Sequence, residues 1–377
     1  MEERNNLREL AKLFLKLGII GFGGPAAHIA MMQEEVVHKK KWLSEQHFQD
    51  LIGATNLIPG PNSTEMAIHI GHERAGWKGL IVAGFCFILP AVLITGFFAW
   101  LYKEYGQLPE LKPFLYGIEP AIIAIILAAI FPLARKSLKT IELGVIGCVV
   151  LLLSVLHYNE IVILFGAGFL ALFLHSLKKS KSDKTTRNWI PLALFPVSKT
   201  TLVASTNWNL FLIFLKIGAI LYGSGYVLFA FLDAELVAKG LLSRSQLIDA
   251  IAVGQFTPGP VFSSVTFIGY QINGITGALI STFAIFLPSF VFVALLNPLV
   301  KKLRNSKPFS VFLDAVNVAS VAIIVSICFQ MGRDTITDWR TILIAVLSIG
   351  IAFYYKKINS AIIVLGGAIT GYLLSYI

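Results

Sequence analysis

Long apolar stretches separated by short polar connections run through the whole chain. A helix that crosses a membrane needs about 20 mostly apolar residues. Several stretches reach this length, among them Trp77–Tyr102, Phe114–Ala134 and Ile275–Asn297. The pattern therefore predicts an all-α polytopic membrane protein.

The apolar stretches follow the same order in the two halves of the chain. Each half begins with an apolar helix interrupted by glycines, continues with two short segments that flank Pro-Gly-Pro, and ends with longer helices. The predicted elements are 7–30, 46–71, 77–102, 114–134, 141–157 and 160–177 in half one, and 207–230, 245–271, 275–297, 309–331, 340–355 and 360–377 in half two.

This shared order reflects an internal repeat. Phe14–Gly24 aligns with Phe214–Ser224 at an offset of 200, and six of the eleven positions are identical. Further along, Pro59-Gly60-Pro61 matches Pro258-Gly259-Pro260. Chance similarity between apolar helices would not preserve a lysine and a Pro-Gly-Pro in order, so the two halves are homologous. We predict an N-terminal repeat at 1–177, a basic linker at 178–206 and a C-terminal repeat at 207–377.

The charge distribution favours membrane insertion over nucleic-acid binding. Only 14% of the residues are charged, against roughly a quarter in soluble domains. The net charge is +10, and the basic residues gather in short loops between apolar stretches, as is typical of cytoplasmic loops. The three cysteines stand singly, so neither a metal site nor a disulfide framework is predicted.

The Pro-Gly-Pro segments decide the predicted topology. If each forms a re-entrant helical hairpin, each half has about five spans and the second half is an inverted repeat of the first. The linker 178–206 and the loop 301–307 then lie in the cytoplasm, and both termini lie outside. If Pro-Gly-Pro only kinks a sixth span, this segregation of basic loops disappears. We therefore favour the inverted repeats.

Helix breaks at membrane depth are the strongest functional signal. Backbone groups without partners cost several kcal/mol in hydrocarbon, yet Gly23-Gly24-Pro25 and Pro59-Gly60-Pro61 both interrupt helices. Broken helices are tolerated where they line a cavity, and their N-terminal ends present N–H groups to anions. Matching breaks in half two predict four such ends near a pseudo-twofold axis. The alternative is that these residues only permit close helix packing.

Two long motifs resemble those of a known family. FGGPAAH at Phe22–His28 and PGPNSTEM at Pro59–Met66 are similar to motifs of the chromate ion transporter (CHR) family, in its two-domain long-chain form. The resemblance covers nearly the whole chain. It implies a plasma-membrane carrier that exports chromate and so confers metal resistance. Half two departs from both motifs, which suggests that half one carries more of the substrate chemistry.

The candidate substrate-binding residues flank the four breaks and include one lysine in each first helix. We expect main-chain N–H groups to hold the anion, with side-chain donors from the start of the helix after Pro-Gly-Pro. Each lysine either balances a dianion or extends its amine to the membrane surface. The residues are Gly23, Gly24, Pro25, His28, Pro59, Gly60, Pro61, Asn62, Ser63, Thr64, Lys16, Lys216, Gly223, Gly225, Pro258, Gly259 and Pro260.

Three residues are candidates for proton coupling. Glu65 and His69 are four residues apart, so they lie on one helix face and could share a proton. The alternative for Glu65 is a helix-capping pattern with Asn62. Glu119 lies within a long span, where carboxylates are costly and usually functional. Its alternative role is to bind the backbone group freed by Pro120.

These features predict a secondary active transporter of a tetrahedral oxyanion. The specific prediction is efflux of chromate, coupled to protons, across a bacterial-type plasma membrane. No P-loop accompanies the helices, so ATP hydrolysis by this chain is not predicted. Transport of sulfate or another anion, and an anion channel, stay open as alternatives. The scattered histidines argue against an enzyme. We expect no cofactor, no metal and no nucleic-acid partner, and a homodimer is left open.

Overall fold

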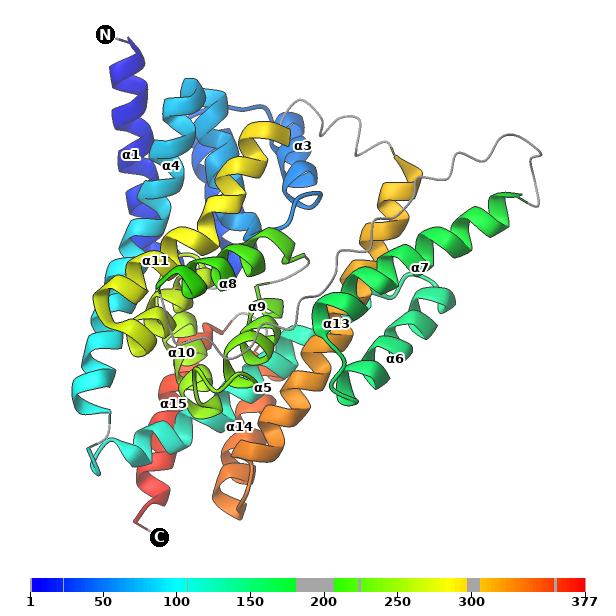
Figure 1. Cartoon of the computed structure of the whole chain (residues 1–377). Helices are drawn as coiled ribbons and strands as arrows, with labels where there is room; N and C mark the ends of the chain where they lie inside the picture. Colours follow the sequence, from blue (N-terminus) through cyan, green and yellow to red (C-terminus); the bar gives the residue numbers. More distant parts are fainter. Residues whose placement is uncertain are drawn as a thin grey trace.

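The chain folds into helices joined by short loops (Figure 1). The computed structural model describes residues 2–22, 24–106, 108–180, 207–222, 225–296, 306–355 and 358–376. Most of the predicted linker, 181–206, lies outside these ranges. Half one contains α1 (Glu2–Ile20), α2 (Gly24–Gln33), the π-helix η1 (Glu34–Lys39), α3 (Glu45–Thr55), α4 (Asn62–Tyr105), α5 (Lys112–Ser137), α6 (Ile141–Val155) and α7 (Glu160–Ser180).

Half two repeats this order. It contains α8 (Asn207–Ile220), α9 (Val227–Leu232), the π-helix η2 (Asp233–Val237), α10 (Arg244–Phe256), the 3-10 turn η3 (Val261–Ser263), α11 (Ser264–Leu296), α13 (Lys307–Thr335), α14 (Trp339–Tyr354) and α15 (Ser360–Leu374). Within the described ranges no residue is in a strand. The predicted all-α class is confirmed.

Among the described residues, five helical stretches are long and apolar enough to cross a membrane: Asn62–Tyr105, Lys112–Ser137, Glu160–Leu177, Val261–Leu295 and Lys307–Thr335. Four shorter apolar helices accompany them: α6, α8, α14 and α15. The structure is therefore that of a multi-pass membrane protein.

The long helix α4 is in fact two helices joined by a sharp turn. Ala75 and Gly76 have non-helical backbone angles. A Cβ added to Gly71 or Gly79 would overlap the backbone carbonyl of the other, whereas residues eight apart in a straight helix are about 12 Å apart. Half two repeats this turn in α11, at Asn273 and Gly274. The turn lies where the sequence separates the predicted elements 46–71 and 77–102.

The glycine break between α1 and α2 also reverses the chain. Lys16 and Glu35 are 19 residues apart and would be about 28 Å apart on one straight helix, yet the Lys16 Nζ to Glu35 Oε1 distance is 2.9 Å. Arg74 Nη2 lies 3.6 Å from Glu9 Oε2, so α1 starts beside the turn of α4. The segment 7–30 is therefore a hairpin and not the single span that we predicted. The count of five spans per half and the outside position of the N-terminus both rested on that span.

The two halves interlock in a reciprocal way. α1 packs against α4, and its equivalent α8 packs against α11. The last two helices of each half cross over to the other half: α14 and α15 pack against α5, and α6 and α7 pack against α13 (Figure 1). α4 contacts α11 and α5 contacts α13 along the middle. This reciprocal packing is expected when a pseudo-twofold axis relates the two halves.

One pair of equivalent helices breaks this symmetry. α10 packs against α5, α11 and α15, and eight of its thirteen residues are buried. α3 packs against α4, and only four of its eleven residues are buried. Apolar side chains of α3, such as Phe48 and Leu51, belong to a small separate core with α1 and α4. Helix α10 therefore packs against helices of both halves, whereas its half-one equivalent α3 packs mainly against α4 of its own half.

Candidate functional site

The four helix breaks meet in reciprocal pairs between the halves. The Gly60 N–H donates to the Leu221 carbonyl over 2.8 Å, and the Gly259 N–H donates to the Gly21 carbonyl over 2.7 Å. Each Pro-Gly-Pro loop thus binds the first break of the opposite half. These two glycine N–H groups are already used by carbonyls. At the start of α4, the Thr64 and Glu65 N–H groups donate to the Pro61 carbonyl. The Asn62 and Ser63 amides precede the first of these bonds and have no intrahelical acceptor.

His28 supports the break instead of facing a ligand. Its Nε2 lies 2.8 Å from the Gly21 carbonyl oxygen, and its ring packs edge-on against Phe87. A carbonyl only accepts, so Nε2 is the protonated nitrogen. The Gly21 carbonyl therefore receives two donors, His28 and Gly259. This arrangement satisfies a backbone group that the break frees from its helix.

A cavity of about 290 Å³ opens beside the Pro-Gly-Pro loop of half one. It is lined by Leu57, Ile58 and Asn62 next to that loop, and by Asn317 and Ser320 of α13. One water needs roughly 10–15 Å³ of such space. The cavity therefore has room for a hydrated oxyanion, between groups that come from both halves.

The mouth of the cavity carries an excess of positive charge. Lys136 and Lys139 both line it, and Lys139 Nζ lies 2.7 Å from Asp314 Oδ1. Lys136 has no ion pair with any residue that the structure describes. Asn62 also lines the cavity, and its amide donates to Asn56 Oδ1 over 3.0 Å. No other described residue accepts a hydrogen bond from this amide.

Glu65, in the first turn of α4, is completely buried. Its Oε1 accepts a hydrogen bond of 3.4 Å from Ser289 Oγ of half two. Its Oε2 has no hydrogen-bond partner among the described residues, and the same holds for Thr64 Oγ1 and both ring nitrogens of His69. Glu65 and His69 therefore share no direct hydrogen bond. The predicted cap is also absent, because Asn62 is the first residue of α4 and Pro61 precedes it.

Glu119 of α5 lies where α10 packs against that helix. It accepts a 2.5 Å hydrogen bond from Ser245 Oγ at the start of α10. The sequence aligns Glu119 with Asn317 of half two, which lines the cavity on the open side. The two equivalent positions therefore differ in charge: α5 has the carboxylic acid Glu119 beside α10, and α13 has the neutral amide Asn317 at the cavity.

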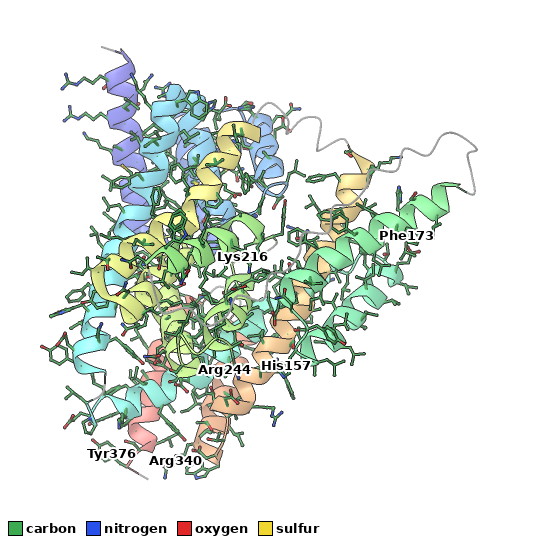
Figure 2. All side chains as sticks on the ribbon, in the orientation of Figure 1. His157, Phe173, Lys216, Arg244, Arg340 and Tyr376 are labelled. Atoms are coloured by element: carbon green, nitrogen blue, oxygen red, sulfur yellow. The ribbon has the colours of Figure 1, made fainter. Side chains whose placement is uncertain are left out.

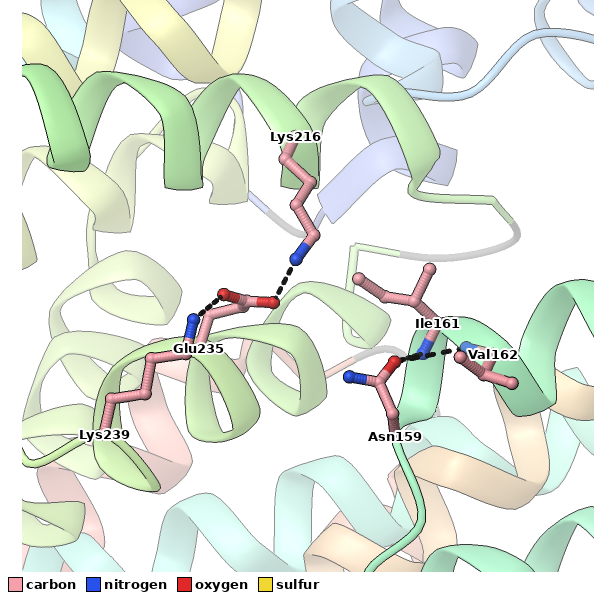
Figure 3. A network of polar contacts seen from close by, with 6 residues as sticks. All are labelled: Asn159, Ile161, Val162, Lys216, Glu235 and Lys239. Carbon is pink, nitrogen blue, oxygen red and sulfur yellow. Dashed lines mark hydrogen bonds and ion pairs between the residues drawn. The ribbon is translucent and has the colours of Figure 1, made fainter. Parts of the chain in front are cut away.

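The two lysines predicted to face the anion are both ion-paired. In half one Lys16 and Lys39 bind Glu35, with Nζ to Oε1 distances of 2.9 and 3.3 Å. In half two Lys216 and Lys239 bind Glu235 in the same way, as Figure 3 shows. The hydrogen bond from Lys16 holds the pKa of Glu35 below its usual value. Burial opposes this effect at Glu235, but its two lysines outweigh burial and also lower its pKa.

The remaining predicted residues are dispersed. Gly23 and Gly223 lie outside the described ranges. A Cβ at Gly24 would have no neighbour within 4 Å, so nothing packs against that glycine. Lys216 lies near the middle of the molecule (Figure 2). Ser63, like Thr64, is buried in the first turn of α4.

Sequence reasoning missed several cavity residues. Asn56, Lys136, Lys139 and Ser320 line the cavity but belong to neither of the two sequence motifs. Only Asn317 had a signal, because it aligns with Glu119. The cavity forms between elements distant in sequence, so no local pattern could have revealed it.

Comparisons with known proteins agree with this architecture. A family model described as chromate transporter matches residues 8–172 and 208–372. A chromate transport protein of Cupriavidus metallidurans is 31% identical over 97% of this chain and 92% of its own length. A probable chromate transport protein of Synechococcus elongatus is 30% identical over 97% of this chain and 95% of its own length. An uncharacterized transporter of Methanocaldococcus jannaschii is 28% identical over 99% and 96%. No solved structure matches.

The family match covers both halves of the chain, and the relatives align with it over almost their full length. The resemblance predicted from the two sequence motifs is thereby confirmed. The chain therefore belongs to the chromate transporter family.

Proposed function

We propose that this protein is a secondary active transporter that exports chromate across the plasma membrane, and that the anion binds in the cavity beside Pro-Gly-Pro. The observation that carries the proposal is the cavity itself, which is lined by Lys136, a lysine without an ion pair among the described residues, and by the amides of Asn62 and Asn317. The relatives named as chromate transport proteins supply the substrate class.

A tetrahedral dianion needs positive charge and several hydrogen-bond donors. Lys136 supplies a charge, and charge-assisted hydrogen bonds are about twice as strong as neutral ones. Asn62, Asn317 and Ser320 supply neutral donors from both halves. The first amides of α4 add main-chain donors and the positive end of a helix dipole. Chromate and sulfate share this geometry, so the same site accepts sulfate as its nearest competitor.

The shape of the cavity supports a carrier over a channel. It is open at the half-one hairpin, while the equivalent place in half two is filled by α10 packed on α5 and α15. A channel requires a path that is open at both ends at once, whereas a carrier exposes its site to one side at a time.

The charge pattern supports export as the direction of transport. Lys136, in the last turn of α5, and Lys139, just after that helix, belong to a basic segment, and basic loops stay in the cytoplasm. The cavity therefore opens to the cytoplasm in this state, where an exporter collects its substrate. The hairpin formed by α1 and α2 also places the N-terminus on this face, because Glu9 lies beside Arg74.

We assign proton coupling to Glu65. It is buried at the contact between the halves, and the hydroxyl of Ser289 is its one hydrogen-bond partner among the described residues. A buried carboxylate without a cation is costly unless it binds a proton. Loading and unloading of that proton at the junction would bias the contact between the halves and so couple a proton to the anion.

Flux in proteoliposomes tests the proposal. Purified protein is reconstituted, and uptake of radiolabelled chromate and sulfate is measured with and without an imposed pH gradient. We expect saturable chromate flux driven by the gradient. Asn62→Ala and Asn317→Ala should each weaken apparent affinity about 2- to 12-fold, since a neutral hydrogen bond contributes about 0.5–1.5 kcal/mol. Lys136→Gln should weaken it by about tenfold or more.

Matched controls separate binding from folding. Asn5→Ala and Lys12→Gln change exposed residues of α1 and should leave chromate affinity unaltered. Glu65→Gln should retain chromate binding but lose the response to the pH gradient. Gradient-driven flux of normal size in Glu65→Gln would exclude Glu65 as the coupling group. Normal affinity in both Lys136→Gln and Asn317→Ala would exclude the cavity as the site.

A further inference from the structure

The starts of α3 and α10 are structurally equivalent. Ser44 caps α3 by accepting from the His47 N–H, and Ser243 caps α10 by accepting from the Gln246 N–H. The first residues of the two helices are therefore an equivalent pair, Glu45 and Arg244. The ends of α5 and α13 correspond as well, because Arg135 aligns with Arg333 and both helices end two residues later.

In half two these positions are joined by polar contacts. Arg244 Nη1 lies 2.5 Å from Asp334 Oδ2 at the end of α13, and Arg244 Nε lies 2.9 Å from Asp233 Oδ1. The next residue, Ser245, donates to Glu119 of α5. Arg244 is labelled in Figure 2. The start of α10 is thereby joined to α5 of half one and to α13 of half two.

Half one has complementary groups at the same positions, with the charges reversed. Glu45 stands where half two has Arg244, and Lys136, the residue after Arg135, stands where half two has Asp334. The neutral pair Gln46 and Asn317 replaces Ser245 and Glu119.

In this structure the half-one groups are apart. Glu45 accepts hydrogen bonds from Gln33 and Gln49, and both Lys136 and Asn317 line the cavity. Across the part of the chain that the structure describes, Glu45 and Lys136 form no ion pair.

We propose that Glu45 with Lys136, and Gln46 with Asn317, form a second gate that closes when the Arg244–Asp334 gate opens. The inference rests on the proposed transport function and deepens it by naming the gating residues. In the second state α3 packs on α13 as α10 now packs on α5, and the cavity of half one closes. A mirror cavity then opens at α10, beside Glu119, and the site faces the opposite side of the membrane.

The reversed charges suit this exchange. Arg244 attracts Asp334 at the end of α13 and is repelled by Lys136 at the end of α5, because both are basic. Glu45 attracts Lys136 and is repelled by Asp334, because both are acidic. Both pairs are partly exposed, and such pairs are individually weak. Neither gate is therefore locked, and the two states remain close in free energy, as an alternating element requires.

Cysteine cross-linking tests the gate. In a protein whose three native cysteines are replaced, Ser245→Cys with Glu119→Cys reports the gate that is closed here, and Gln46→Cys with Asn317→Cys reports the proposed one. We expect the first pair to cross-link readily in membranes and to stop transport until it is reduced. We expect the second pair to cross-link as well, in the minor state.

Asp334→Asn should then raise the population of the second state without changing a residue that lines the cavity. Loss of a partly exposed ion pair should raise cross-linking of the Gln46/Asn317 pair by about 1.5- to 5-fold. Arg4→Gln, on an exposed residue of α1, is the control and should leave the yield unchanged. No cross-link at this pair in the Asp334→Asn protein, or full transport with the Ser245/Glu119 pair cross-linked, would overturn the gate.

The readouts separate this inference from the function. Cross-linking needs no substrate, so formation of both cross-links without chromate flux would support the gate and reject chromate as the cargo. Chromate flux without any cross-link at the Gln46/Asn317 pair would support the function and reject the gate.

Discussion

Replacing Gly60 with alanine tests whether the Pro-Gly-Pro loop is held by the contact between the halves. Gly60 has a φ of +139°, which L side chains rarely adopt. A Cβ there would overlap Glu65 Oε1 and lie 2.5 Å from Ser289 Oγ. Backbone strain costs about 1–3 kcal/mol, and forcing an extra carbon into a packed site costs about 1–3 kcal/mol more. We expect a loss of stability of about 2–6 kcal/mol from these two effects.

Gly24 provides the matched control. Its φ is +79°, and a Cβ there would have no neighbour within 4 Å. Gly24→Ala therefore carries the backbone strain alone, about 1–3 kcal/mol. The difference between the two variants isolates the contact with Glu65 and Ser289, which should be about 1–3 kcal/mol.

Thermal unfolding in detergent, followed by tryptophan fluorescence, measures the difference. Gly60→Ala should unfold several degrees below Gly24→Ala, and Ser289→Ala should recover part of the loss in the double variant because it removes one of the clashing atoms. Chromate flux should fall with stability, because the Gly60 N–H bond to Leu221 is disturbed. Equal unfolding temperatures for the two glycine variants would refute the proposed packing of the loop.

Three further outcomes follow from the ion pairs and the topology. Glu235→Gln should lower stability by about 1–2 kcal/mol, more than Glu35→Gln, because Glu235 is the more buried carboxylate between two half-exposed lysines; equal unfolding temperatures would contradict this. The pKa of Glu35 is lowered in the folded state. Its contribution to the free energy of unfolding is therefore present above the unfolded pKa of about 4.3 and is lost as pH falls through the folded pKa. Glu35→Gln should remove this part of the pH dependence of stability, and an acid titration that is the same in both proteins would contradict it. An impermeant thiol reagent added outside cells should label Asp338→Cys and spare Glu9→Cys, and labelling of both would reject the topology.

The amino-acid sequence determined the class and the repeat. Apolar stretches of membrane length, a low charged fraction and the duplicated Pro-Gly-Pro are properties of local composition and order, so they can be read without coordinates. The glycine breaks were also predictable, because only interrupted helices explain Gly24-Pro25 and Pro59-Gly60-Pro61 within apolar sequence. The family followed from the same motifs, since they are long and contiguous.

The tertiary structure alone decided how the breaks are used. A glycine break permits either a kink or a reversal, and only the contact of Lys16 with Glu35 shows that the chain turns back. The partners of Gly60 and Gly259 come from the opposite half, which no local pattern specifies. The cavity exists because α3 stands away from α13 while α10 is docked on α5. The two homologous helices pack against different neighbours, and these neighbours are distant in sequence, so no local sequence pattern specifies the difference.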